Sequence, residues 1–296
     1  MASSHYFNEK MKRSLLLIFV ALLLPCSLQG QKTTTVESAA EVLQPGRFLR
    51  SGSTLGFGLI TTCFDSYLSP NNYMGIELDF LNENWRRSAR RDNLFLQSIY
   101  DSSIGLTESG STSMTFVANE VYSDAWAWRV ARLGVVDFYA GPELQTRVGI
   151  VYNMRNSNNP ANLKLGFHVG GMGMAEVRYR ILHIPARTSY QLDFPLVGAV
   201  FSPQYTQSYY EIFTLKHYAG TVHFVSPFNG FSLRRILTTD LTIRDSIMRV
   251  ILENDSYQWH TSTNSYAIRS FRLGFGFVFN SYSILPREKA SDYLPY

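Results

Sequence analysis

The chain has 296 residues, enough for one large domain or two small ones. Charged residues make up 17% of the sequence, below the roughly 25% usual in soluble domains, and aromatic residues reach 14%. The net charge of +4 is small and no nucleic-acid-binding motif stands out, so we expect no nucleic-acid partner.

The N-terminus predicts export. Two basic residues follow Met11 and precede an apolar run, Leu15–Leu24, which is the order of a secretory signal peptide. We expect a signal peptide over residues 1–30, with Met11 an alternative start, and a polar arm over residues 31–50. After the signal only Cys63 remains, so no internal disulfide is expected, and no later run of 18 apolar residues predicts a transmembrane helix.

From residue 51 onward, segments that alternate apolar and polar residues recur between turn signals. In LKLGFHVGGMGMAEVRYRI (163–181) every charged residue holds an even position. Successive side chains leave a strand on opposite faces, so this pattern predicts a strand with one charged face. Similar alternation occurs near residues 55–63, 136–152, 187–196, 231–243 and 271–279, and weaker alternation near 73–84, 92–103, 112–131, 217–226 and 246–255. We expect ten to twelve strands and no helix.

Two details of this alternation are open to test. If the alternation that begins at Leu55 continues without interruption, Cys63 lies on the apolar face. In the segment 231–243, Arg235 falls on the apolar face and is a misfit.

Alternation alone does not say which face is buried. A soluble sandwich would bury the aromatic face and expose the charges, whereas a membrane barrel would do the reverse. Export, mixed charges with glycines on the polar faces, and Tyr or Trp near the ends of the apolar faces favour the barrel. The predicted fold is a single antiparallel up-and-down transmembrane β-barrel of 10–12 strands over residues 51–281, with a C-terminal tail over 282–296.

The charged faces would then line the lumen and pair with one another. In a barrel of this size such pairs leave the lumen largely filled, which argues against a wide pore. The candidate lumen charges are Asp137, Glu143, Arg147, Lys164, Glu176, Arg178, Arg180, Asp193, Arg234, Asp240 and Arg272.

Four stretches also carry a family resemblance. They are DSYLSPNNYMGIELDFLNENWRR (65–87), YNMRNSNNPANLKLGFHVGG (152–171), PLVGAVFSPQYTQSYYEIF (195–213) and SYQWH (256–260). They resemble an uncharacterised family of predicted outer-membrane proteins of Bacteroides-type bacteria, a domain of unknown function. The resemblance implies an outer-membrane barrel and brings no activity, ligand or catalytic residue.

One short motif raises an enzymatic alternative. In WHTSTN (259–264), His260 and Ser262 are two residues apart, and a His-x-Ser pair on a barrel wall resembles the site of outer-membrane lipid hydrolases. There the histidine would take the serine proton and the serine would attack an ester. Those enzymes typically have Asn directly after Ser, whereas this chain has Thr263, so we expect no enzymatic activity.

The tyrosine-rich run FSPQYTQSYYEIF offers candidate contacts with a glycan or a protein, because tyrosine combines an apolar face with a hydroxyl group. The candidates are Tyr205, Tyr209, Tyr210 and Glu211. The alternative is an interfacial girdle or a loop folded into the barrel mouth. We expect no cofactor and no metal, because the histidines lack cysteines or carboxylates at ligand spacing.

Taken together, the sequence predicts a structural, accessory or ligand-binding component of the outer membrane. Its expected partners are membrane lipid and also lipopolysaccharide or other outer-membrane proteins. Two alternatives stay open, a lipid hydrolase that uses His260 and Ser262, and a narrow channel for small solutes.

Overall fold

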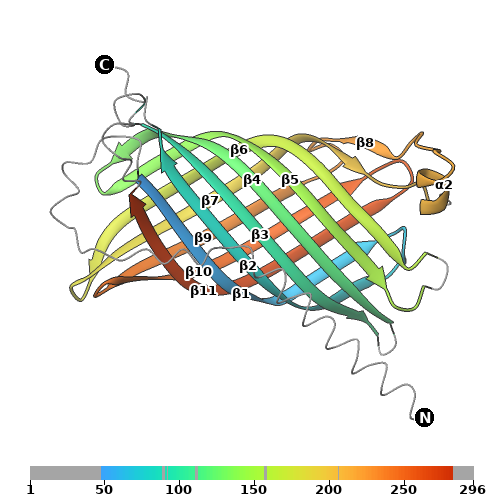
Figure 1. The fold of residues 1–296 in the computed structure, drawn as a ribbon, viewed down its shortest axis with the longest axis horizontal. Coiled ribbons are helices and arrows are strands. Elements are labelled where there is room, and N and C mark those ends of the chain that lie inside the picture. The colour runs from blue at the N-terminus through green and yellow to red at the C-terminus, as the bar shows by residue number, and fades with distance from the viewer. Residues whose placement is uncertain are drawn as a thin grey trace, which may run out of the picture. The chain divides into compact units, whose positions relative to one another are not determined.

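A computed structural model describes residues 48–88, 91, 93–110, 113–156, 159–205 and 207–282. The predicted signal peptide, most of the predicted arm and nearly all of the predicted tail lie outside these residues. The described part of the chain consists of eleven strands and one short helix (Figure 1). Within it, no helix is long and apolar enough to cross a membrane.

Most of the strands are long. They are β1 (Phe48–Asp65), β2 (Asn72–Arg87), β3 (Leu94–Ser109), β4 (Ser113–Leu133), β5 (Val136–Asn153), β6 (Ala161–Ile181), β7 (Ile184–Phe201), β8 (Val222–Val225), β9 (Ser232–Ile243), β10 (Ser246–His260) and β11 (Ser265–Tyr282). The helix is α2 (Tyr209–Phe213). Because β1 begins at Phe48, the last three residues of the predicted arm belong to the first strand.

Antiparallel pairing closes these strands into a barrel. Neighbours along the chain pair from β1 to β7, then β7 pairs with β9, β9 with β10, β10 with β11 and β11 with β1. The short β8 adds to the last residues of β7, beyond the part of β7 that pairs with β9. Ten strands therefore complete the ring, and the predicted closed antiparallel barrel is confirmed.

The two ends of the barrel differ in their connections. Phe48 pairs with Tyr282, so the chain enters and leaves at one end, which we call the termini end. Three hairpins turn there with two residues each, Gly134–Val135, Leu182–His183 and Arg244–Asp245. Gly134 has φ +59, a conformation that glycine adopts without steric cost. The opposite end, which we call the α2 end, carries α2 and β8 between β7 and β9.

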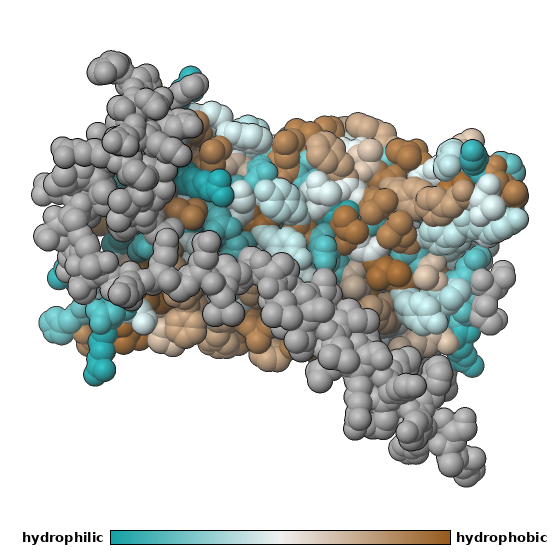
Figure 2. All heavy atoms as spheres, viewed as in Figure 1, coloured by the Kyte–Doolittle hydropathy of each residue, from teal (hydrophilic) through white to brown (hydrophobic). Residues whose placement is uncertain are grey.

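Charged side chains point into the barrel and apolar side chains point out. On β11, Arg272 is 3% exposed, whereas Phe275 and Phe277 are 55% and 51% exposed. On β6, Lys164 is 6% exposed and Phe167 50%. Figure 2 shows brown, apolar residues on the outer surface of the barrel. The fold is thus a sheet closed around its own polar face.

A bulge in β1 corrects one detail of the predicted pattern. The register shifts between Gly58 and Ile60, so Leu59 and Ile60 both point outward. The extra residue reverses the alternation beyond it, and Cys63 is buried inside rather than on the apolar face. The prediction for Cys63 was therefore wrong.

The helix α2 is a second correction, because no helix was predicted. It follows a capping box in which the Ser208 side chain accepts from the Glu211 backbone N–H and the Glu211 side chain accepts from the Ser208 backbone N–H. Ser208 and Glu211 are three residues apart, as the motif requires, so this signal was present in the sequence.

Candidate functional site

The middle of the lumen is held by two arginines and three carboxylates. Arg272 on β11 binds Glu77 on β2 (Nε–Oε1, 2.6 Å) and Asp101 on β3 (Nη1–Oδ2, 2.7 Å). Arg234 on β9 binds the same Asp101 oxygen (Nη2–Oδ2, 3.0 Å) and Glu253 on β10 (Nε–Oε1, 2.6 Å). All five side chains are at most 4% exposed. This cluster, the central tier, links strands on opposite walls and fills the space between them.

Toward the α2 end, aromatic rings accompany the charges. Arg147 binds both carboxylate oxygens of Asp255 at 2.8 and 2.9 Å and lies 4.4 Å from the centroid of the Tyr257 ring. Lys164 binds Asp65 at 2.9 Å and lies 4.5 Å from the centroid of the Tyr266 ring. The rings pack around the cations and leave little free space in this part of the lumen.

The α2 end of the lumen is covered from above. The Tyr209 hydroxyl donates to the Asn162 side chain at 2.8 Å, and the Tyr67 hydroxyl donates to the Gln207 carbonyl at 2.9 Å. The two rings meet edge to face, with centroids 6.4 Å apart. Burial raises the pKa of the Tyr67 and Tyr209 hydroxyls, so both remain neutral donors. The loop that carries α2 is thereby fastened across the mouth.

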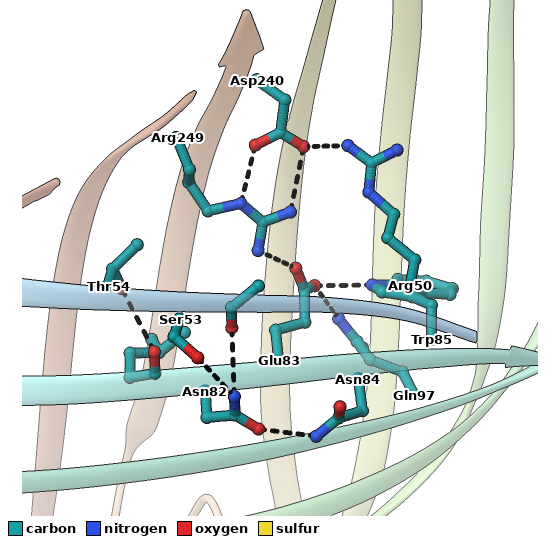
Figure 3. A network of polar contacts seen from close by, with 12 residues as sticks. Arg50, Ser53, Thr54, Asn82, Glu83, Asn84, Trp85, Gln97, Asp240 and Arg249 are labelled. Atoms are coloured by element: carbon teal, nitrogen blue, oxygen red, sulfur yellow. Dashed lines mark hydrogen bonds and ion pairs between the residues drawn. The ribbon is translucent and has the colours of Figure 1, made fainter. Parts of the chain in front are cut away.

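A third group of charges lies toward the termini end (Figure 3). Arg249 donates to Asp240 (Nε–Oδ1, 2.7 Å) and to Glu83 (Nη1–Oε2, 2.5 Å), and Arg50 forms an ion pair with Asp240. Glu83 also accepts from the Trp85 indole N–H at 2.6 Å. We call this cluster the lower tier.

Glycines on β1 make room for these side chains. A Cβ atom added to Gly52 would lie 2.3 Å from Nη1 of Arg249, and one added to Gly56 would lie 2.1 Å from Oδ1 of Asp79. Both distances are too short for any contact, so the lumen depends on bare backbone at these positions.

Below the lower tier, at the termini end, the lumen opens into a cavity of about 540 Å³, which we call the vestibule. One side is charged and is formed by β1, β6, β7 and β9. Its charged lining residues are Arg50, Glu176, Arg178, Arg180, Arg187 and Asp240. Four arginines face two carboxylates, so the lining carries an excess of positive charge.

The other side of the vestibule is aromatic. Trp85 on β2, Phe95 on β3 and Tyr139 on β5 meet edge to face, with ring centroids 5.6 to 6.2 Å apart. On β4, Ala125 and Ala127 pack against them, and these small side chains leave space for the rings. The vestibule therefore has one cationic wall and one apolar wall.

The arginines of the charged wall differ in how firmly they are held. Arg187 forms ion pairs with Glu176 and, at 3.8 Å, with Asp240, and its side chain is 16% exposed. Arg178 also binds Glu176 (Nε–Oε1, 2.8 Å), but its side chain is 69% exposed. Arg180 is exposed, and no ion pair forms between it and any described residue. Arg178 and Arg180 can therefore turn toward an incoming anion.

The structure places most of the predicted lumen charges inside the barrel. The buried ones are Asp137, Glu143, Arg147, Lys164, Glu176, Asp193, Arg234, Asp240 and Arg272. Arg178 and Arg180 lie at the vestibule instead of deep in the lumen. Sequence reasoning missed several partners: Arg50, Asp65, Asp101, Arg249, Glu253 and Asp255. Many of these lie on strands with weak alternation, although each occupies an inward position.

The predicted contact and hydrolase residues lie at the α2 end. Tyr205 and Tyr210 are 64% and 63% exposed, whereas Tyr209 points into the mouth. His260 ends β10, and its Nδ1 contacts the Ser265 hydroxyl. Ser262 lies in the following turn, and within the described residues no hydrogen bond joins it to His260. Arg235 points outward, on the apolar face where the alternation placed it, and donates to the Asn254 side chain at 3.2 Å.

These features define a closed, ten-stranded barrel with a charged lumen and an apolar outer face. The chain belongs to the DUF3316 family, described as a protein of unknown function, whose pattern matches residues 15–288. This family match accords with the predicted resemblance to a domain of unknown function.

Comparison with other proteins adds structural neighbours only. No curated protein matches the chain. The translocator domain of the autotransporter NalP from Neisseria meningitidis is 8% identical, with 94% of this chain and 98% of that chain covered and a TM-score of 0.37. An outer membrane channel from Pseudomonas putida F1 is 7% identical, with 84% and 100% covered and a TM-score of 0.35.

Proposed function

We propose that this protein is an outer-membrane barrel, closed to solute flow, that binds a small amphipathic anion in its vestibule. It would serve as a ligand-binding component of the membrane and carry no enzymatic activity. A source in Bacteroides-type bacteria, which the family resemblance implies, would supply an outer membrane.

The membrane location is supported by the two faces of the sheet. Outward phenylalanines such as Phe275 and Phe277 are more than half exposed, and water would solvate that surface poorly. Inward arginines such as Arg234 and Arg272 are sealed from solvent and paired. In the ring of ten strands each strand also pairs with two neighbours, whereas hydrocarbon would not tolerate an open sheet.

The orientation follows from the connections. Outer-membrane barrels have short periplasmic turns and longer extracellular loops. The two-residue turns lie at the termini end, so the vestibule would face the periplasm and α2 would face the exterior.

The two-faced vestibule is the observation that carries the binding proposal. Arg178 and Arg180 would bind a carboxylate, phosphate or sulfonate, because a guanidinium donates two parallel hydrogen bonds to such groups. Trp85, Phe95 and Tyr139 would hold an apolar body on the opposite wall. Above them the lower tier stops the ligand from passing through the barrel.

Binding can be tested by calorimetry on the full chain in maltoside detergent, with naphthalene-2-sulfonate as the probe. We expect the double variant Arg178→Gln/Arg180→Gln to weaken binding about tenfold or more, through the loss of charge-assisted hydrogen bonds. Arg235→Gln/Arg269→Gln is the matched control, because it removes the same charge from two outward arginines. Equal loss in both variants, or equal binding of the cation naphthalen-1-ylmethylammonium, would contradict the proposal.

Closure of the lumen is tested separately in planar lipid bilayers. The channel alternative requires a water-filled path, whereas the central tier and the packed rings occupy the lumen between the vestibule and α2. We expect no stepwise conductance from the reconstituted protein. Reproducible unitary currents would show that solutes pass, and the proposed closure would fail.

A further inference from the structure

The outward face of the barrel carries a polar region that a lipid-facing wall should not have. It lies across the outer faces of the strands β1 to β4. Figure 2 shows pale and teal residues between brown ones near the middle of the barrel. We call this region the polar wall. Its residues are Ser51, Ser53, Asn82, Asn84, Ser98, Tyr100, Ser102, Glu120, Tyr122 and Asp124.

These side chains point away from the lumen, because their neighbours along each strand point in. Leu81 and Glu83 flank Asn82 and are directed inward, as are Val121 and Ser123 beside Tyr122. Tyr122 is 46% exposed. The polar wall is therefore part of the outer surface and does not belong to the lumen network. In Figure 3 its residues Ser53, Asn82 and Asn84 lie near the lower tier, on the other side of the same strands.

The wall runs from strand to strand, since Asn84 on β2 lies opposite Ser98 on β3, and hydrogen bonds join its two halves internally. Asn82 donates to the Ser53 hydroxyl at 2.8 Å, and Asn84 donates to the Asn82 side-chain oxygen at 2.6 Å. Ser98 and Tyr122 donate to Oδ1 of Asp124 at 2.5 and 3.0 Å. Within the described residues both bonds to this carboxylate end on Oδ1, so Oδ2 is left for a partner.

The depth of the wall makes it costly in a membrane. Ser53 pairs with Phe277, so this part of the wall lies beside the apolar belt of β11. Strands in such a barrel tilt by about 40°, so positions of equal depth shift by about one residue per strand. By this rule Ser53, Asn82, Ser98 and Asp124 lie at similar depth. Lipid tails offer amides and carboxylates no hydrogen bonds, so the wall requires a polar partner within the bilayer.

The distribution of donors and acceptors across the wall points to the partner. Its β1 and β2 side carries the hydroxyl and amide groups of Ser53, Asn82 and Asn84. Its β4 side carries Glu120 and Asp124, whose carboxyl oxygens accept hydrogen bonds. One side of the wall is thus complementary to the other.

We infer that the polar wall binds a second copy of this chain, an inference that rests on the proposed membrane location. Two copies inserted in the same direction are related by a two-fold axis along the membrane normal. An axis between β2 and β3 brings these two strands of each copy into the closest contact and places the donors of β1 across from the acceptors of β4 at equal depth. The same axis keeps the carboxylates of one copy apart from those of the other.

Cross-linking in reconstituted vesicles tests this geometry. The double variant Ser53→Cys/Asp124→Cys should form covalent dimers with a flexible bis-maleimide, because β1 of one copy lies across from β4 of the next, while the curvature of the two walls keeps these positions beyond the reach of a disulfide. Each single variant should form far fewer, since the axis separates each residue from its own counterpart. The native Cys63 is buried inside and does not interfere. Equal cross-linking of the single and double variants would overturn the two-fold arrangement.

Subunit counting by single-molecule photobleaching tests the association itself. Asn82→Leu/Asp124→Leu should raise the dimer dissociation constant about tenfold or more while the barrel remains inserted, because leucine suits a lipid-facing position. Leu165→Met/Phe167→Leu, outward changes on β6, should leave the constant unchanged.

The outcomes separate this inference from the proposed function. Protein that floats with vesicles but stays monomeric at every protein-to-lipid ratio overturns the dimer and leaves the membrane location intact. If Ser53→Cys or Asp124→Cys forms cross-links to a different protein in native membranes, the inference that a second copy binds the polar wall is wrong. Protein that does not float with vesicles refutes the membrane location, and the dimer with it.

Discussion

Arg272 on β11 and Asp101 on β3 meet across the lumen, with Nη1 and Oδ2 2.7 Å apart. Arg234, from β9, binds the same oxygen of Asp101. Two cations from one wall thus converge on one carboxylate of the other wall. The barrel is held closed across its interior by such contacts as well as by the hydrogen bonds of its strands.

Removal of one member of the central tier should be strongly destabilising. Arg272→Met would leave Glu77 and Asp101 with less compensation for their buried charge, and we expect the free energy of unfolding to fall by about 3–5 kcal/mol. Urea titration monitored by tryptophan fluorescence measures this. Arg235→Met, an outward change that leaves the tier intact, should not lower it, because a lipid-facing position favours methionine over arginine. Similar values for both variants would show that the tier does not stabilise the fold.

The lumen glycines give a second prediction. Gly56→Ala places a Cβ 2.1 Å from Oδ1 of Asp79, so we expect a loss of about 1–3 kcal/mol of stability from overpacking. Gly173→Ala is the control, because nothing lies within 4 Å of the added Cβ there. The midpoint of urea unfolding compares the two variants. If Gly56→Ala is as stable as Gly173→Ala, the lumen has more room than the structure indicates.

Acid should loosen the loop that carries α2. Hydrogen bonds from Ser208 lower the pKa of Glu211 below its ordinary value of 4.5. Because the pKa of Glu211 is lower in the folded state, the cap stabilises α2 fully above about pH 4.5. This stabilisation is lost as the pH falls through the pKa of Glu211 in the folded state. The protection factors of residues 208–215 against hydrogen exchange, which correct for the slower intrinsic exchange in acid, should therefore fall as the pH is lowered. Glu211→Gln should remove this pH dependence, and an unchanged dependence would rule out Glu211 as its cause.

The hydrolase alternative is tested by ester cleavage. His260 contacts Ser265 rather than Ser262, and among the described residues no carboxylate is hydrogen-bonded to either group. We expect no hydrolysis of p-nitrophenyl laurate above the protein-free rate. Hydrolysis that is lost in His260→Ala would instead support an enzyme, and comparison of Ser262→Ala with Ser265→Ala would then identify the nucleophile.

The clearest periodic stretches were predictable from sequence, and others were not. The alternation of 163–181 predicted β6 and its inward Lys164 and Glu176, because period two leaves no other regular arrangement. Cys63 was misplaced because a bulge adds one residue without changing the local composition. The vestibule was not predictable, since Trp85 and Tyr139 come together only when the barrel closes.

The most direct test of the account is where a spin label on the outer wall resides. In a Cys63→Ser background, a nitroxide at Phe275→Cys is compared with one at Tyr210→Cys, which is exposed on α2. If lipid covers the phenylalanine face, the label at position 275 collides with oxygen and is shielded from a water-soluble nickel chelate, and the label at position 210 shows the reverse. Free access of the chelate to position 275 in vesicles would mean that water, and not lipid, surrounds the phenylalanine face.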